Sequence, residues 1–284
     1  MMTPLETLLH HLDLEPLDRN LWRGFTPRTG RTRVYGGQVI AQALVAAIRT
    51  VEQRACHSLH GYFMLPGDPA LPILFEVDRI RDGRSFATRR VRAIQNGAAI
   101  FAMMASFHAE EAGLHHQMPM PEVALPDQLP DDEAIRERYV PLLSENRQAY
   151  WRAKRPIEVR PADPDAYFLR KPGEARHHIW FRASERLPDD PMVHTAILAY
   201  ASDMTILDSA AVPHGKSVAD ADIQAASLDH ALWFHESFRA DDWLLYSQDS
   251  PWSGHARGLG RGLIYRQDGR LVATVMQEGL IRPV

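Results

Sequence analysis

The sequence predicts an α+β fold of two similar halves, in each of which a curved antiparallel sheet wraps around one long, buried helix. Two observations carry this prediction. The same order of elements, a helix, a strand and then a long antiparallel run, occurs twice along the 284 residues. The dipeptides between the strands are also typical of hairpin turns.

In the first half, Gly36 and Gly37 open the predicted helix in the stretch VYGGQVIAQALVAAIRTV, and the strand HSLHGYFML follows. The antiparallel run then covers residues 72–111. Asp82-Gly83 and Asn96-Gly97 are its predicted hairpin turns, because both dipeptides adopt the positive φ angles that tight turns require.

The second half repeats this order. Its helix begins after Asp189 or Asp190 as N-cap, with Pro191 at the first helical position, and VPHG at 212–215 ends it, which predicts roughly five to six turns. The strand ASLDHALWFH follows, and then the antiparallel run of residues 241–282.

One carboxylate, Asp203, falls inside the apolar stripe of this second helix, among Ala196, Ala199, Tyr200, Ile206, Leu207 and Ala210. A buried carboxylate is costly unless it is hydrogen-bonded. Either Asp203 lies at the edge of the stripe and reaches solvent, or it has a chemical role.

Composition excludes several classes of protein. The formal charge of −4 and the pI near 6.4 provide no basic field for nucleic acid or for an anionic membrane. The single cysteine, Cys56, excludes an internal disulfide, and the scattered histidine pairs do not have the spacing of a metal site. Neither a signal peptide nor a membrane-spanning stretch is evident, so a cytoplasmic location is expected.

A change of composition divides the chain. Nine of its 20 prolines fall between residues 117 and 173, in a polar stretch for which we predict a linker with a short helix around 132–152. The predicted organisation is an N-terminal domain at 1–116, a proline-rich linker at 117–173 and a C-terminal domain at 174–284.

Six stretches in order then carry a family resemblance: YGGQVIAQAL, RDGRSFATRRVRAIQNG, HTAILAYASDMTIL, SLDHALWFH, ARGLGRGLIY and GRLVATVMQEGLIR. With them the chain resembles the type II acyl-CoA thioesterase family, which has a double hotdog fold, over essentially its full length. The resemblance implies hydrolysis of acyl-CoA to a fatty acid and CoA, without a metal or an organic cofactor. The family's catalytic aspartate, hydroxyl residue and glutamine match Asp203, Ser227 and Gln277. The hydroxyl residue is often threonine in bacterial members, so Ser227 is a conservative departure.

In chemical terms, Asp203 is expected to orient and deprotonate a water molecule, which Ser227 and Gln277 fix from two adjacent strands. A covalent mechanism with serine as nucleophile is less favoured. The GxSxG motif is missing, and His230 and His235 follow Ser227 at strand offsets that do not suit a catalytic pair. The C-terminal domain is therefore expected to carry the catalytic residues.

Other parts of the sequence leave alternatives open. Gly36, Gly37 and Gln38 form either a tight helix entry or a substrate-binding site in which free amides hold the thioester oxygen. A series of arginines is either the solvated face of a hairpin or a landing surface for CoA phosphates: Arg79, Arg81, Arg84, Arg89, Arg90 and Arg92.

The alternative functions are a hotdog hydratase or dehydratase acting on acyl-CoA and a non-catalytic acyl-CoA-binding protein. The expected partners are the acyl-CoA substrate and further copies of the chain, in a dimer or tetramer. Alignment of the halves places Ala105 opposite Gln277 and Ser58 opposite Ser227, and the first-half helix has no acid to match Asp203. One catalytic centre per chain is therefore expected.

Overall fold

The computed structural model describes residues 2–27, 32–169 and 172–284. Its contacts divide the chain into two compact units, each built from several stretches. The first comprises Met1–His116, Leu187–Met204 and Leu228–His235, and the second comprises Gln117–Arg186, Thr205–Ser227 and Glu236–Val284. The predicted domain boundaries at 116 and 173 stay a prediction.

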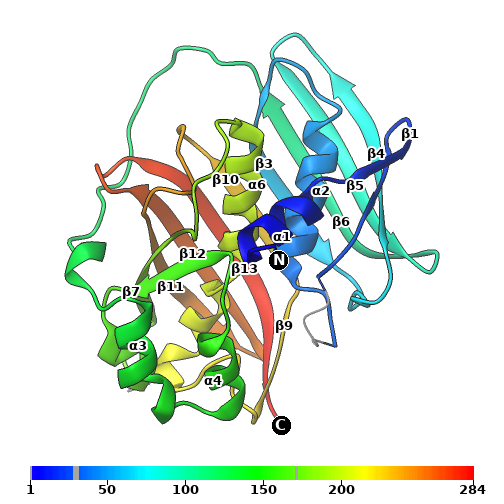
Figure 1. Ribbon diagram of the computed structural model, residues 1–284. Helices are drawn as coiled ribbons and strands as arrows, with labels where there is room; N and C mark the ends of the chain where they lie inside the picture. Colours follow the sequence, from blue (N-terminus) through cyan, green and yellow to red (C-terminus); the bar gives the residue numbers. More distant parts are fainter. Residues whose placement is uncertain (1, 28–31, 170–171) are drawn as a thin grey trace. The chain divides into compact units, whose positions relative to one another are not determined.

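The first unit contains an antiparallel sheet and the helix that lies against it (Figure 1). Helix α2 (Gly36–Ile48) is buried along nearly its whole length and contacts β3, β4, β5 and β6. Helix α1 (Pro4–Leu12) begins with a capping box between Thr3 and Glu6 and packs on α2. The strands follow in their order across the sheet: β1 (Glu15–Asp18), β2 (Leu21–Gly24), β4 (Ile73–Asp82), β5 (Phe86–Gln95), β6 (Ala98–His108), β3 (Ala55–Phe63) and β10 (Asp229–Phe234).

Both predicted hairpins are present in this sheet. Asn96 and Gly97 have φ angles of 48° and 76° and form the two-residue turn between β5 and β6. The Asp82-Gly83 turn is longer than a two-residue turn, because β4 ends at Asp82 and β5 begins at Phe86. The Gly83 amide closes this loop by donating to the carbonyl of Phe86 at 2.8 Å.

The second unit contains antiparallel strands that pair with one another. The strands follow in order: β7 (Ile157–Pro161), β8 (Arg176–Ala183), β11 (Leu244–Gly254), β12 (Arg257–Arg266), β13 (Leu271–Pro283) and β9 (Ile223–Ser227). The short 3₁₀ helix η3 (Ile206–Ala210) contacts β11, β12 and β13, and η4 (Val212–His214) follows it.

Three glycines at alternate positions of β12 let η3 and a tyrosine ring approach this sheet. A Cβ on Gly260 would lie 2.6 Å from the carbonyl oxygen of Ile206, and a Cβ on Gly258 would lie 2.6 Å from the Cβ of Ala210. A Cβ on Gly262 would lie 2.2 Å from the ring of Tyr246. Residues at alternate positions share one face of a strand, so the GLGRG pattern describes a face without side chains.

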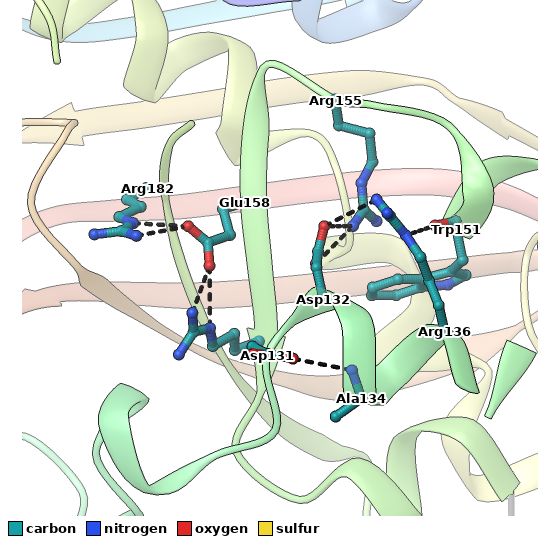
Figure 2. A network of polar contacts seen from close by, with 9 residues as sticks. Asp131, Asp132, Ala134, Arg136, Trp151, Arg155, Glu158 and Arg182 are labelled. Atoms are coloured by element: carbon teal, nitrogen blue, oxygen red, sulfur yellow. Dashed lines mark hydrogen bonds and ion pairs between the residues drawn. The ribbon is translucent and has the colours of Figure 1, made fainter. Parts of the chain in front are cut away.

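The proline-rich segment is more ordered than a linker. It contains η1 (Pro126–Gln128), α3 (Asp132–Arg138), η2 (Val140–Leu142), α4 (Glu145–Arg152), β7 and α5 (Pro164–Leu169). Figure 2 shows Asp132 paired with Arg155 and Glu158 paired with Arg182. Arg155 also lies over the ring of Trp151, at 4.4 Å from its centroid. The Glu158–Arg182 pair and the β7–β8 pairing tie the segment to β8.

The predicted second helix is wrong in length. Helix α6 (Pro191–Ser202) begins as expected, with Asp190 as N-cap and Pro191 at its first position, but it ends at Asp203. The hydroxyl of Ser202 donates back to the carbonyl of Ala199 at 2.9 Å, the kind of bond that competes with helix continuation. The apolar residues after the break form η3 instead. They share a helical spacing with α6, which explains the error.

The predicted strand ASLDHALWFH is also interrupted. It forms β9, which pairs with β13, and β10, which pairs with β3, and Leu228 lies between them. The carbonyl of Leu228 accepts a hydrogen bond from the Phe63 amide at 2.9 Å. The chain thus passes from one ladder to another at this residue. Among the described residues, no helix has both the length and the apolar character needed to span a membrane.

Candidate active site

Asp203 lies at the C-terminal end of α6 and faces the first turn of α2. Its Oδ2 accepts a hydrogen bond from the backbone amide of Gly37 at 2.8 Å. The N-terminus of a helix carries partial positive charge and unsatisfied amides, so this position stabilises a carboxylate. Asp203 is half-buried, and its carboxylate lies at the N-terminus of α2 within the first unit.

The paired glycines exist because the two helices approach so closely here. A Cβ on Gly36 would lie 2.7 Å from Oδ2 of Asp203, and a Cβ on Gly37 would lie 2.3 Å from the carbonyl oxygen of Tyr200. Tyr35 adds a further bond, because its hydroxyl donates to that same carbonyl at 3.0 Å. Any larger residue at either glycine would displace Asp203 or α6.

These contacts change the expected role of the glycines. The Gly37 amide is engaged by Asp203, so it is not the free donor that was expected to hold a thioester oxygen. The amide of Gln38 donates to the carbonyl of Tyr35 at 3.1 Å, as in a regular first turn. A substrate-binding role for Gly36, Gly37 and Gln38 stays a prediction.

In this turn of α2, the buried side-chain amide of Gln38 lacks a hydrogen-bond partner among the described residues. Only 2% of Gln38 is exposed, and the atom without a partner is Nε2. One turn later, the Nε2 of Gln42 donates to the carbonyls of His11 and Phe25 and so holds the N-terminal segment. A buried amide donor without a partner is rare in proteins and calls for a water molecule or a ligand.

Ser227 and Gln277 meet in the second unit. Ser227 ends β9 and pairs with Gly279 on β13, so the side chain of Gln277, two residues away, lies on the same face as that of Ser227. The Nε2 of Gln277 donates to Oγ of Ser227 at 2.9 Å, and only 1% of Gln277 is exposed. Gly279 leaves room beside them for Leu207, whose Cδ2 would lie 2.4 Å from a Cβ at this position.

The three predicted catalytic residues are thus described in two groups. Asp203 belongs to the first unit, and the hydrogen-bonded pair Ser227 and Gln277 belongs to the second. Their joint action stays a prediction. Of the two histidines considered as partners for a nucleophilic serine, His230 is fully buried in the first unit and bonds to Ser202 at 2.8 Å.

Three arginines of the series pair with carboxylates on the same hairpin. Arg90 pairs with Asp78, and Arg92 pairs with Glu76. Arg89 is only 1% exposed, and it donates to Asp82 and to both the hydroxyl and the carbonyl of Thr50. Arg89 therefore has a structural role, and the geometry of the hairpin favours the first of the two interpretations.

Two further observations concern metals and thiols. Within residues 2–27, 32–169 and 172–284, there is no group of three His, Cys, Asp or Glu side chains that could hold a metal ion. The only cysteine, Cys56, is buried on β3, and its burial raises the pKa of the thiol to about 12. Cys56 is therefore protonated and unreactive at neutral pH.

Sequence reasoning missed two features of this region. One is the contact of Tyr35 with Tyr200, and the other is the buried pair of Ser202 and His230. The adjacent glycines after Tyr35 were a usable signal for the first, since two glycines at a helix start indicate a close neighbour. Nothing in the sequence pattern identifies the second.

Comparison with known families supports one assignment. The model of the acyl-CoA thioesterase N-terminal domain matches residues 26–108, and the acyl-CoA thioesterase model matches residues 148–280. Together the two matches cover most of both halves of the chain.

Individual relatives agree with this result. Acyl-coenzyme A thioesterase 8 of Homo sapiens is 41% identical over 282 residues, which cover 95% of this chain and 87% of the human protein. The crystal structure of an acyl-CoA thioesterase II from Mycobacterium marinum matches with a TM-score of 0.81 and 45% identity, over 98% of both chains. A protein with a hot dog fold from Alicyclobacillus acidocaldarius matches with a TM-score of 0.77 over 98% of this chain and 99% of its own. At 20% identity, this last match speaks for the fold alone.

Proposed function

This chain belongs to the type II acyl-CoA thioesterase family and has an α+β hotdog fold, and from that premise we propose that Asp203 activates the water that hydrolyses its substrate. The enzyme converts acyl-CoA to a fatty acid and CoA. The observation that carries the proposal is the bond from the Gly37 amide to the Asp203 carboxylate, at the junction of two helix ends.

We propose the following steps. Asp203 takes a proton from water as the water oxygen attacks the thioester carbonyl carbon. The tetrahedral intermediate then collapses, the C–S bond breaks, and Asp203 returns the proton to the CoA sulfur. A carboxylate offers about four acceptor sites, so Asp203 can accept from the Gly37 amide and from other donors at the same time.

Ser227 and Gln277 complete the proposal from the second unit. The Ser227 oxygen accepts from Gln277, and this bond fixes the side chain that we propose to help hold the attacking water. Gln38 is the proposed donor to the thioester oxygen, which gains negative charge as water attacks, because its buried Nε2 lacks a partner in the described protein. Gly36 and Gly37 allow the close approach on which this arrangement depends.

The wider organisation is proposed on the basis of the family. Each half forms one hotdog domain with a central helix wrapped by its curved sheet, giving a double hotdog. The chains assemble into a dimer or tetramer and act in the cytoplasm. The internal repeat of elements supports the first of these statements, since both halves follow the order helix, strand and antiparallel run.

Hydrolysis by the Asp203→Asn variant tests the mechanism. Asparagine keeps the size and can still accept from the Gly37 amide, but it cannot act as a base. We expect kcat for release of CoA thiol to fall by about 10² to 10⁴-fold, with KM much less affected, across acyl-CoA thioesters of several chain lengths.

The matched control is Asp190→Asn, at the other end of the same helix. Asn replaces Asp as an N-cap with little loss, so this variant should hydrolyse acyl-CoA like the wild type. A folded Asp203→Asn protein with near-normal kcat would refute the proposed role of Asp203.

A further inference from the structure

Two buried polar side chains meet at the last turn of α6, directly before Asp203. Ser202 is the final residue of the helix, and His230 lies on β10. Both residues are 0% exposed, and Oγ of Ser202 lies 2.8 Å from Nε2 of His230.

The direction of this hydrogen bond follows from the serine. Ser202 has one hydroxyl proton, which it donates to the carbonyl of Ala199 at 2.9 Å. We therefore assign the proton to Nε2 of the imidazole, which donates to the oxygen of Ser202. His230 is thus a buried hydrogen-bond donor on β10, and its acceptor is the last residue of α6.

The strand gives the histidine a rigid base. β10 pairs with β3 over five residue pairs, from Asp229 opposite Tyr62 to Trp233 opposite Ser58. His230 itself lies opposite Gly61, whose missing side chain makes room for the ring of Phe101. The imidazole is thus attached to the same sheet against which α2 packs.

Asp203 is consequently held from two sides. Its carboxylate accepts from the Gly37 amide of α2, and the preceding residue accepts from His230 of β10. The helix ends between these two bonds, so both of them act on its last residues and on Asp203. A base displaced by about 1 Å loses on the order of 10²-fold in rate.

We propose that His230 is a positioning residue of the hydrolysis: through Ser202 it fixes the end of α6 and thereby the carboxylate of Asp203. The inference rests on the proposed role of Asp203 as the base. It assigns His230 no contact with the substrate and no proton transfer.

The test uses variants on both sides of the bond, with kcat, KM and the melting temperature measured for each. His230→Leu removes the donor, and Ser202→Ala removes the acceptor. Each should lower kcat by roughly ten to a hundredfold while KM changes little. His230→Gln keeps an amide donor near the position of Nε2 and should recover most of kcat.

A double variant and a matched control separate positioning from general damage. His230→Leu with Ser202→Ala should be no slower than the slower single variant, because all three lose the same hydrogen bond between residues 202 and 230. Ser209→Ala is the control. Ser209 is also 0% exposed, and it also donates to a carbonyl three residues back, Ile206, at 2.7 Å. This variant should keep the wild-type kcat.

The inference is overturned if His230→Leu, Ser202→Ala and the double variant lower only the melting temperature. It is also overturned if the two single effects on kcat multiply in the double variant, or if His230→Gln is as slow as His230→Leu. If instead Asp203 is not the base, the result is different, because the Asp203→Asn variant would then keep its activity. With Asp203→Asn already present, His230→Leu should slow the enzyme no further.

Discussion

The two halves of this chain follow one plan, but only the first half follows it without interruption. In the first half, α2 is a continuous helix and β3 is a continuous strand. In the second half, α6 stops at Ser202, and the matching strand is divided at Leu228 into β9 and β10. Asp203 follows the first break directly, and Ser227 precedes the second.

The difference shows how a repeated fold can acquire a polar site. A carboxylate within a continuous apolar helix would be buried without an amide partner, because interior amides already bond to the carbonyls four residues back. At a helix end the carboxylate can accept from the N-terminus of another helix, as Asp203 does from Gly37. The interruptions thus place polar side chains where hydrogen bonds are available.

The two halves also differ in the side chains at matching strand positions. Ala105 and Gln277 occupy matching positions of the repeat, and each is 1% exposed. Burial is therefore equal, and the chemistry differs: Gln277 donates to Ser227, whereas Ala105 adds only apolar volume on β6. Ser58, which matches Ser227, pairs with Ser106 on β6, and Ala105 pairs with the next residue, Leu59.

The largest expected effect concerns the number of catalytic centres. If only the second half supplies Asp203, Ser227 and Gln277, then Asp203→Asn should remove all of the activity and not half of it. Titration of the wild type with a tight, unreactive acyl-CoA analogue should give one equivalent per chain. Half-activity, or two equivalent sites per chain, would show that the first half is also catalytic.

A smaller effect is expected from the hydrogen-bonded pair. Gln277→Ala should lower kcat by about 10²-fold, because the donor that orients Ser227 is lost. Ser227→Ala should keep measurable hydrolysis, and mass spectrometry of a quenched wild-type reaction should find no acyl ester on Ser227. The control is Ser58→Ala, at the matching position of the first half, which should keep the wild-type kcat. An ester on Ser227 would establish the covalent mechanism instead.

The smallest of the three effects concerns the glycine beneath Asp203. Gly36→Ala places a Cβ 2.7 Å from Oδ2 of Asp203, too close for these two atoms, so the carboxylate must move, and kcat should fall roughly tenfold. Alanine favours a helix more than glycine does, so the melting temperature should not fall in parallel.

Gly113→Ala is the control for this substitution, because no atom lies within 4 Å of a Cβ at that position. A Gly36→Ala enzyme with unchanged kcat would mean that the contact with Asp203 does not matter for the reaction.

Much of the fold could be predicted from local patterns. Asp190 and Pro191 marked the start of α6, and Asn96 with Gly97 marked the turn between β5 and β6, because caps and tight turns depend on a few adjacent residues. The proximity of Ser227 and Gln277 followed from the family resemblance, which places both residues in one catalytic set.

What could not be predicted depends on contacts between distant residues. The end of α6 is set by the back-bonding of Ser202 and by the fit of η3 on the glycine face of β12, while the apolar spacing continues through the break. The ion pairs that order residues 117–173, such as Arg182 with Glu158, join positions far apart in sequence. Periodicity within one segment carries no information on such partners.

The buried thiol of Cys56 has a practical consequence at the bench. The products of this reaction include a new sulfhydryl, that of CoA, which a chromogenic disulfide reagent can count. Because the only cysteine is shielded on β3 and its pKa of about 12 keeps it out of the thiolate form, the folded enzyme contributes no background colour near neutral pH. The same reagent becomes an indicator of unfolding once the substrate is omitted, since one equivalent of colour per chain would then report the opening of the first unit.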